Sequence, residues 1–525
     1  MTSSDETRWD AVVIGGGHNG LVCAAFLGRV GRKVLVLEAE EQIGGAGRTH
    51  EFAPGFRVSM AHLLNRLHPE VVKALELEKH GLDLSPAHQV PTVALSSEGK
   101  PLILTGAYGE GLEGADASEK QAWAEVRAQL FRYADILKPL LARRPPSLDG
   151  MDLAASSAWA MTGLSLKRLG REDMRDFLRV LLMNVADFCD EGLQDDRLKG
   201  LLAFDAVLGS HLGPRSPTSL LGLYYRLAGE LGGAPGAQLV PAGGTGAVMA
   251  AVRKAAEAAG VTIRTSAVAA KVFVEKGRAT GVMLDSGEDI RAGKVISALN
   301  PATTFLELVG PQHLDTGFVR RVSNIRMKGD AAKLHLALER IPAFNGLPQQ
   351  YRNARLVIAS STDYVERAFN PAKHGEFSPE PAMEITLPSI GDPSLAPTGA
   401  SVLSATIQYA PYLLKEGWVA GKPKLLEAVL SVLERHAPGI RKTILHSELL
   451  TPADIEARYR MPGGHWHHGE LQADQMLMSR PVFGAEGYHT PLPGLFLAGS
   501  GSHPGGGIFG VPGMNAARRV LGGRA

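Results

Sequence analysis

The feature that most constrains the fold is a glycine-rich stretch near the start of the chain. Residues 11–20 read AVVIGGGHNG, an apolar run that breaks into glycines and continues as an alanine-rich segment. Gly15, Gly17 and Gly20 match the spacing G-x-G-x-x-G, in which the first glycine makes a tight turn, the second lets a pyrophosphate approach, and the third lets helix and strand pack closely. The stretch therefore predicts a strand, a turn and a helix that bind a dinucleotide.

The neighbouring residues fit this interpretation. Residues 11–14 predict a buried strand, residues 21–27 a helix, and residues 34–37 a second strand that ends at Glu38. An acidic side chain about 20 residues after the first glycine accepts a hydrogen bond from a ribose hydroxyl and repels a 2′-phosphate. Glu38 is therefore the predicted ribose ligand.

The composition excludes several classes of protein. The 525 residues carry a formal net charge of +1 and only 21% are charged, so no basic field is available to bind nucleic acid. The two cysteines, Cys23 and Cys189, lie far apart in the sequence and cannot form the dithiol pair that a disulfide reductase uses. The length predicts two domains, or one large domain with an inserted lobe.

Targeting and membrane signals are not visible in the sequence. Residues 1–9 are polar and acidic and lead directly into the first strand, which leaves no room for a signal peptide and predicts a cytoplasmic location. The longest uncharged stretches, residues 393–414 and 491–517, are interrupted by Pro, Gly, Ser and Thr, unlike a membrane-spanning helix. Peripheral membrane contact stays open, because the apolar segment 177–188 fits either lipid or core. The oligomeric state also stays open, with a homodimer as one option.

Changes of pattern divide the chain into five segments. Residues 8–105 open with an α/β pattern, and residues 106–236 turn helical, with apolar residues at spacings of three and four. Residues 237–303 return to a glycine turn, a helix and strands. Residues 304–460 contain short strands of a mixed or antiparallel sheet, and residues 461–525 end in strand, glycine cluster and helix. We therefore predict an α/β fold with a helical insertion.

Within residues 304–460 the clearest strand pattern begins at Lys333. Lys333, His335 and Ala337 alternate with leucines at 334, 336 and 338, which predicts a half-buried strand.

The C-terminal segment points to the kind of dinucleotide. Residues 494–521 read GLFLAGSGSHPGGGIFGVPGMNAARRVL, and the helix that begins near Pro512 presents bare backbone N–H groups in an uncharged region. A reduced flavin is an anion that such a helix end stabilises. Because both ends of the chain carry a strand, glycine and helix pattern, we predict that they hold one large cofactor, FAD.

The split arrangement, with Gly44-Gly45 shortly after Glu38, resembles the FAD-binding oxidoreductases of the glutathione-reductase-like superfamily, second structural group. Further stretches are similar to the phytoene desaturase-like family: GGGHNGLVCAAFLGRVGRKVLVLEAEEQIGGAGRTHEFAPGF, PAGGTGAV, GRATGVML and GLFLAGSGSHPGGGIFGVPGMNAAR. MPGGHWHHGELQADQMLMSRP, residues 461–481, is similar to the branch of that family named for a pyridine nucleotide-disulfide oxidoreductase domain.

The resemblance implies a division of the chain into domains. A Rossmann-like FAD-binding domain would comprise residues 8–105, 237–303 and 461–525, with a mixed or antiparallel substrate-side domain at 304–460 and the helical insertion at 106–236. The disulfide activity in the branch name conflicts with the two distant cysteines.

The resemblance also implies a set of FAD contacts. Arg48 departs from the family pattern because Ala46-Gly47 separate it from the glycine pair, so a surface arginine is the alternative; Ala269 stands where family members carry valine, and Val268 is the alternative contact. The implied contacts are Gly15, Gly17, Gly20, Glu38, Gly45, Arg48, Ala269, Gly499, Ser500, Gly507, Gly513, Met514 and Asn515.

A flavin accepts a hydride, so the protein must hold the substrate carbon against the ring and accept one proton. The candidate proton acceptors or substrate anchors are His62, His468, Glu470, Tyr488 and His503, of which His503 lies inside the C-terminal glycine cluster. The histidines at 465, 467 and 468 lack a helical i, i+4 pair, so we predict no metal site. His18 is expected to line the cofactor pocket.

Three functions fit these features. The first is dehydrogenation, or desaturation, of an apolar, lipid-like or natural-product substrate. The second is amine oxidation, which would place an aromatic cage of Trp466 and Tyr488 beside the flavin. The third is a flavin-binding scaffold with little turnover, because fold does not fix function. The glycine turn at 243–246 lacks a downstream acidic partner for NAD(P), which leaves oxygen or a quinone as electron acceptor.

Overall fold

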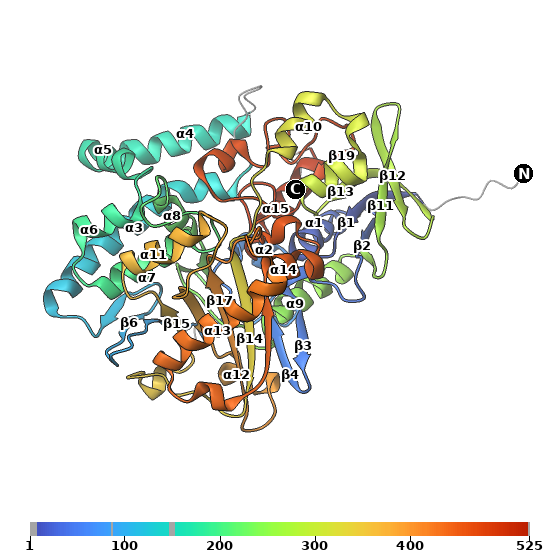
Figure 1. Cartoon of the computed structure of the whole chain (residues 1–525). Coiled ribbons are helices and arrows are strands. Elements are labelled where there is room, and N and C mark those ends of the chain that lie inside the picture. Colours follow the sequence, from blue (N-terminus) through green and yellow to red (C-terminus); the bar gives the residue numbers. More distant parts are fainter. Residues whose placement is uncertain (1–7, 86–87, 146–152, 523–525) are drawn as a thin grey trace, which may run out of the picture.

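Two β-sheets, one of seven strands and one of eight, organise the chain in a computed structural model that describes residues 8–85, 88–145 and 153–522 (Figure 1). The strand, turn and helix predicted at the start are present as β1 (Trp9–Ile14) and α1 (His18–Arg29), followed by β2 (Val34–Leu37). Residues 1–7, on which the prediction of a cytoplasmic location rests, lie outside the described residues.

The first sheet has the order β10-β2-β1-β13-β12-β11, and β19 also pairs with β13. Strands β10, β2, β1, β13 and β19 run parallel, whereas β11, β12 and β13 form an antiparallel meander whose first turn is at Lys276 and Gly277. The strands not yet bounded are β10 (Thr262–Arg264), β11 (Ala269–Glu275), β12 (Arg278–Leu284), β13 (Asp289–Ser297) and β19 (Leu495–Leu497).

Both faces of the first sheet are covered, because successive side chains of a strand point to opposite faces. Ala11 and Val13 of β1 pack with α1, α9 (Thr245–Ala258) and α15 (Val511–Val520). Val12 and Ile14 pack on the other face with Phe305 and Phe318, whose rings meet edge to face at 4.9 Å. The first and last helices thus pack side by side although they lie at opposite ends of the sequence.

The second sheet has the order β18-β14-β17-β16-β15-β5-β6-β7. It contains β5 (Thr92–Ala94), β6 (Leu102–Thr105), β7 (Gly111–Glu113), β14 (Ala331–Leu338), β15 (Arg355–Ile358), β16 (Met383–Thr386), β17 (Ser401–Gln408) and β18 (Ile444–Leu450). Residues 92–105 therefore pair into this sheet, whereas the sequence grouped them with the cofactor-binding segments. The sequence pattern of a short strand is the same in either sheet. Only the long-range pairing of β5 with β15 shows that these residues belong to the second sheet.

Strand β14 is buried along its whole length, which corrects the prediction of a half-buried strand. Leu334 and Leu336 pack in the core beneath α13 (Trp418–His436), whereas Ala337 packs against β4 (Phe56–Ser59) on the opposite face. Lys333 and His335 share that second face, so the alternating polar residues point into the protein rather than into solvent.

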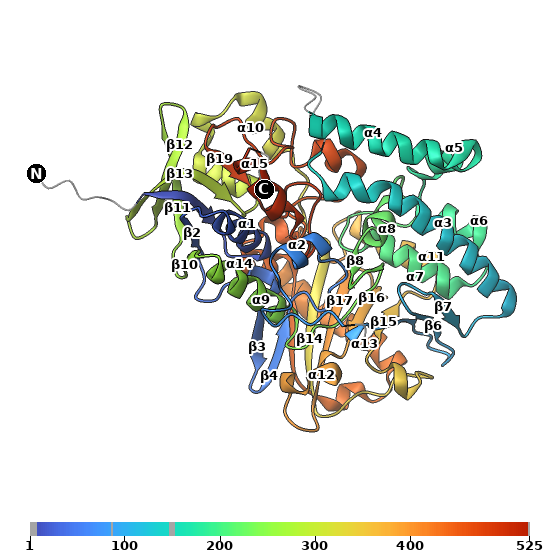
Figure 2. The same cartoon turned by 180° about the vertical axis from the view of Figure 1, so that it is seen from behind.

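Of the remaining elements, the helices of the insertion cover the second sheet, whereas α10 lies against the first sheet (Figure 2). Helices α3 (Ala117–Ala142), α4 (Leu153–Arg168), α5 (Gly170–Val180), α6 (Val185–Gly192), α7 (Asp196–Val207) and α8 (Leu220–Leu227) form the predicted helical insertion. The other elements are β3 (Thr49–Ala53), β8 (Glu230–Leu231), β9 (Ala234–Pro235), α2 (Pro69–Ala74), α10 (Thr316–Ser323), α11 (Thr362–Ala372), α12 (Pro388–Gly391) and α14 (Pro452–Tyr459). Across the described residues, every helix is too short or too polar to cross a membrane.

Candidate FAD site

The glycine turn between β1 and α1 has the geometry that a pyrophosphate site requires. Gly15 has φ +102°, a conformation that residues with a side chain rarely adopt. A Cβ at Gly20 would lie 2.1 Å from the Gly15 carbonyl oxygen, so only glycine lets α1 approach the strand. A Cβ at Gly17 would meet no atom within 4 Å, which leaves the space that a phosphate group needs beside the N-terminus of α1.

Glu38 closes the same turn from the end of β2. Its Oε2 accepts a hydrogen bond from the Gly16 N–H at 2.8 Å, and its Oε1 accepts one from the Glu40 N–H at 3.0 Å. These bonds hold the carboxylate beside the turn, where a ribose hydroxyl can donate to it.

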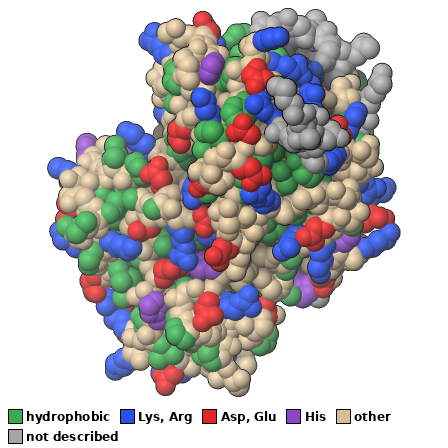
Figure 3. All heavy atoms as spheres, turned by 90° about the vertical axis from the view of Figure 1, so that its right-hand side faces the viewer, with side chains coloured by type: hydrophobic (Ala, Val, Ile, Leu, Met, Phe, Trp, Pro, Cys, Tyr) green, Lys and Arg blue, Asp and Glu red, His purple; other side chains and the backbone are tan. Residues whose placement is uncertain are grey.

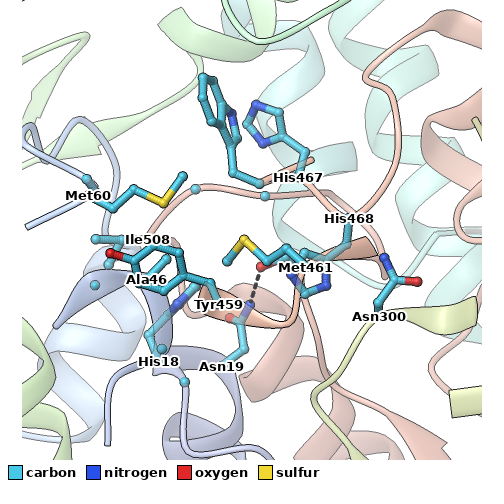
Figure 4. A pocket seen from close by; sticks show the side chains of 18 of the residues that line it. His18, Asn19, Ala46, Met60, Asn300, Tyr459, Met461, His467, His468 and Ile508 are labelled. Carbon is cyan, nitrogen blue, oxygen red and sulfur yellow. Dashed lines mark hydrogen bonds between the residues drawn. The ribbon is translucent and has the colours of Figure 1, made fainter. Parts of the chain in front are cut away.

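A cavity of about 640 Å³ is lined by residues of the glycine turn and by Lys333 of β14, and Figure 4 shows part of its wall. Its size is that of a site for a large ligand. The predicted FAD contacts that line it are Gly15, Gly17, Gly20, Glu38, Gly45, Arg48, Ala269, Ser500 and Gly507. Val268, the alternative to Ala269, lines it as well. Arg48 lies 3.7 Å from Glu40 and stacks over the ring of Tyr459, so it belongs to the cavity wall.

Four predicted contacts, Gly499, Gly513, Met514 and Asn515, lie outside the cavity wall. A Cβ at Gly513 would lie 2.1 Å from the Asn19 carbonyl oxygen, so this residue faces α1. The Met514 side chain is in the core, and Asn515 donates hydrogen bonds to Tyr488 and to the Ala142 carbonyl. These residues of the last helix therefore contact other parts of the protein and do not line the cavity. Gly506, Gly507 and Ile508 line it instead.

Several polar atoms of the cavity wall are buried without a hydrogen-bond partner. They include Nε2 of His18, Oδ1 of Asn19, and Nδ1 of His467 and His468. Figure 4 shows these four side chains around the space between the glycine turn and residues 466–468. Unpaired buried polar groups are costly unless a ligand or water satisfies them. Together with the turn and Glu38, they fit a large cofactor that carries many polar groups, as FAD does.

Burial also keeps these histidines neutral. It lowers the pKa of His18 to about 4 and that of His468 to about 3, with Arg480 contributing to the second shift. The pKa of His467 is well below its ordinary value for the same reason. These side chains therefore offer neutral donors and acceptors to a ligand at neutral pH.

Three of the five predicted proton acceptors lie outside the cavity. His503 is fully buried and donates from Nε2 to the Leu140 carbonyl at 2.8 Å. Tyr488 donates to the His503 carbonyl at 2.9 Å, and the Glu470 carboxylate accepts from the His211 N–H. The imidazole of His503 therefore points away from the cavity, although Gly506 and Gly507 of the same glycine cluster line it. Tyr488 does not line the cavity, so it forms no aromatic cage with Trp466, which does.

The structure adds a lysine that the sequence analysis did not select. Lys333 of β14 lines the cavity, is 2% exposed, and has its Nζ in contact with Nδ1 of His62. Nε2 of His62 lies 3.2 Å from Oε1 of Glu384, and Lys333 also donates to Thr406 at 3.3 Å. Burial lowers the pKa of Lys333 to about 7 although Glu384 opposes the shift, and it lowers the pKa of His62 to about 4.

This arrangement makes Lys333 the stronger base of the pair. The Nδ1 lone pair of His62 takes a hydrogen bond from Lys333, and Glu384 fixes the proton on Nε2. An alternating strand pattern was the available signal for Lys333, because a lysine on a strand that proves to be fully buried must face another polar group.

Metal and thiol chemistry find no support among the described residues. No group of three or more His, Cys, Asp or Glu side chains there is arranged to hold a metal ion. Cys23 and Cys189 are both buried, in separate hydrophobic clusters, and burial raises the pKa of each thiol. Neither thiol has the thiolate character of a reactive cysteine.

The fold and the cavity together define an FAD-dependent oxidoreductase, and comparison with known proteins agrees. Residues 20–521 match the flavin-containing amine oxidoreductases, and the chain belongs to this family.

A rat protein named pyridine nucleotide-disulfide oxidoreductase domain-containing protein 2 is 37% identical over 98% of this chain and 93% of its own length. A neurosporene-forming phytoene desaturase of Cereibacter sphaeroides is 26% identical over 97% of this chain and 93% of its own length. The structure of a putrescine oxidase bound to putrescine has a TM-score of 0.60 at 15% identity and covers 98% of this chain and 99% of that one. These likenesses confirm the predicted α/β FAD-binding fold and the suspected family.

Proposed function

We propose that this enzyme desaturates an apolar, lipid-like substrate. The observation that carries the proposal is a buried lysine in the cavity wall, Lys333 of β14, whose Nζ contacts Nδ1 of His62 and whose pKa burial lowers to about 7. When bound, FAD accepts a hydride, the two electrons and one hydrogen of a broken C–H bond. The neighbouring C–H bond loses a proton, and the electron pair left behind forms the C=C bond.

The part of the cavity that contains the glycine turn and Glu38 binds the cofactor. The turn at Gly15–Gly17 and the N-terminus of α1 would hold the pyrophosphate, and the Glu38 carboxylate would accept hydrogen bonds from the ribose hydroxyls. Ser500 and Gly507 approach from the C-terminal cluster, where the Ser500 hydroxyl accepts a hydrogen bond from Asn19 at 3.3 Å.

Lys333 accepts the proton. Its amine is neutral above about pH 7 because the buried site penalises the ammonium form. His62 and Glu384 position the amine, since Lys333 donates to His62 and Glu384 holds that ring in one tautomer. A general base with a pKa near the working pH is the most effective one.

The cavity wall favours an apolar substrate. Apolar side chains lining it include Met60, Leu63, Leu208, Met461, Trp466, Leu471 and Ile508. The phytoene desaturase relative is named for a polyene substrate. An amine substrate lacks the cage predicted from Trp466 and Tyr488, and its ammonium group would lie in a cavity that also contains Arg66 and Lys333.

The experiment is anaerobic reduction of the FAD-loaded protein, followed as loss of flavin absorbance. Phytoene and a cyclic terpene are compared with putrescine as the amine. We expect a polyene or terpene to bleach the flavin, with a Lys333→Met variant that retains FAD reacting about a hundredfold more slowly or less. Bleaching by putrescine and by neither hydrocarbon would refute the proposal. Reoxidation by oxygen and by a soluble quinone, measured separately, identifies the electron acceptor.

Exposed apolar residues support peripheral membrane contact, from which a lipid-like substrate would enter. Leu178 and Leu182, on and just after α5, are 58% and 56% exposed, and Arg171 and Arg175 lie on the same helix. The helix carries three arginines and three acidic side chains, so the membrane contact rests on the exposed leucines rather than on a net positive charge. On the face in Figure 3, positive and negative side chains are interspersed. Co-sedimentation with anionic vesicles should fall in a Leu178→Glu variant, and equal binding would contradict the membrane contact.

A further inference from the structure

The cationic side chains of the cavity wall differ in whether a carboxylate lies close enough to form an ion pair with them. Arginine or lysine occurs at six positions of the wall in the described part of the chain. Four lie within 4.0 Å of a carboxylate: Arg48 with Glu40 at 3.7 Å, Arg226 with Asp205 at 3.4 Å, Arg458 with Glu448 at 2.6 Å, and Arg460 with Glu40 at 3.5 Å. The other two are Lys333 and Arg66.

Lys333 and Arg66 respond differently to burial. Lys333 can release its proton, because its pKa falls to about 7. Arg66 is 6% exposed, and burial lowers its pKa, yet a guanidinium stays protonated at any working pH. No carboxylate of the described residues lies within 4.0 Å of Arg66. The cavity therefore holds one permanent positive charge without a counter-ion, which a buried site tolerates poorly.

The contacts of Arg66 hold its guanidinium in place without neutralising it. The group stacks over the ring of Tyr225 at 4.0 Å, and its Nε donates to Oδ1 of Asn65 at 3.3 Å. A Cβ at Gly507 would lie 3.0 Å from the Arg66 Cδ, so the glycine leaves room for the stem of the side chain. Both polar partners are neutral, and a planar, fixed guanidinium is suited to bind an oxyanion through two parallel hydrogen bonds.

We propose that Arg66 binds an anionic head group, a carboxylate, on the lipid-like substrate of the reaction proposed above. Tyr225, on which the guanidinium stacks, belongs to α8 of the helical insertion, whereas the expected pyrophosphate site is at the N-terminus of α1. The Tyr225 hydroxyl donates to the Gly506 carbonyl at 2.7 Å and so fixes the ring beneath the guanidinium. The substrate is then an amphipathic acid, with its apolar chain along the walls and its carboxylate at Arg66.

The test is ligand binding to the FAD-loaded protein with two matched ten-carbon probes, decanoate and decanol. Binding is measured by calorimetry and by the shift of the flavin absorption bands. We expect decanoate to bind the wild-type protein at least about tenfold more tightly than decanol, a difference that corresponds to one charged hydrogen-bonded contact. Equal affinity for the two probes would overturn the proposal, and this comparison needs no variant.

Variants identify the residue. Arg66→Met should weaken decanoate about tenfold or more and leave decanol unchanged, whereas Arg66→Lys should retain part of the affinity. Arg127→Met is the matched control, because Arg127 is a partly buried arginine of α3 that bonds backbone carbonyls outside the cavity. Unchanged decanoate affinity in Arg66→Met, with its melting temperature and FAD content preserved, would overturn the assignment.

A second measurement separates the substrate from the cofactor as the source of the anion. The affinity for FAD and the affinity of the bound flavin for sulfite both report positive charge at the cofactor. If Arg66→Met lowers these two affinities and leaves decanoate binding unchanged, Arg66 serves the cofactor and the proposal is refuted. Decanoate is saturated and is bound rather than converted. Its binding therefore tests the role of Arg66 separately from the question of whether polyenes reduce the flavin.

Discussion

Replacing Lys333 by Met is expected to stabilise the protein while it slows the reaction. Methionine has nearly the length of lysine and no charge, so it fills the same buried space beside His62 and Glu384. The wild-type lysine costs stability because its pKa falls from 10.5 in the unfolded chain to about 7 in the folded one. Between these two pKa values the unfolded chain binds more protons than the folded chain, so the stability of the wild-type protein rises with pH from about 7 to 10.5.

The size of the effect follows from the same shift. A fall from 10.5 to about 7 corresponds to about 5 kcal/mol, as one pKa unit is about 1.4 kcal/mol. The full cost applies at and below about pH 7, and it decreases to about 1 kcal/mol near pH 9.5. A chain of 525 residues unfolds with an entropy of about 1 kcal/mol per kelvin. The variant should therefore melt a few degrees higher near pH 7, with most of the gain lost near pH 9.5.

The assay is thermal unfolding of the apoprotein at the two pH values, combined with anaerobic flavin reduction of the holoprotein. Lys294→Met is the control, because Lys294 is a partly buried lysine of β13 outside the cavity. In the wild-type protein the reduction rate should rise with pH through about 7 and then level off, as the neutral amine becomes the dominant form. The rate should fall about a hundredfold or more in Lys333→Met.

Two outcomes would refute this reasoning. A melting temperature that is unchanged or lower in Lys333→Met at about pH 7 would show that the buried ammonium is compensated. A stability gain with an unchanged rate of flavin reduction would show that the lysine is buried in the cavity without accepting the proton.

The remaining predictions concern the cofactor half of the site. Gly17→Ala should weaken FAD binding about tenfold or more and leave the melting temperature of the apoprotein unchanged, because a Cβ at residue 17 meets no protein atom. Gly20→Ala should destabilise the apoprotein by about 1–3 kcal/mol, because a Cβ at residue 20 meets the Gly15 carbonyl oxygen. Equal stabilities of the two apoprotein variants would contradict this prediction. Glu38→Gln should weaken FAD binding by about 1.5–3 kcal/mol in equilibrium titration, and an unchanged affinity would exclude the ribose contact. His503→Asn should lower the melting temperature, because the bond to the Leu140 carbonyl is changed, and should leave the pH profile of flavin reduction unchanged. A shifted pH profile would show that His503 takes part in the reaction.

The cofactor half of the site follows from the sequence because its residues are close together in the chain. The turn between Gly15 and Gly20 is a local structure, and its glycines are required by contacts within the turn itself. Glu38 follows on the neighbouring parallel strand, at the distance that one helix imposes.

The errors arise where long-range packing decides which way a side chain points. His503 lies in the glycine cluster that borders the cavity, yet its ring bonds a carbonyl of α3. Asn515 lies within α15 and donates hydrogen bonds to Tyr488 and to the Ala142 carbonyl at the end of α3. Sequence proximity to a glycine cluster places the backbone near the cofactor, but the orientation of each side chain depends on helices elsewhere in the chain.

The residues proposed for substrate chemistry show why a substrate is harder to infer than a cofactor. Lys333 and His62 are 271 residues apart, and no local pattern brings a lysine and a histidine of that separation into one contact. Arg66 and Tyr225 come from the segment after β4 and from the helical insertion, and they meet only because α8 packs against that segment. Among the described residues of the cavity wall, Lys333 can release its proton, whereas Arg66 keeps a permanent charge without an acidic partner, which destabilises a fold. Such groups fit a site that exchanges a proton and binds an anion, and only the assembled cavity reveals them.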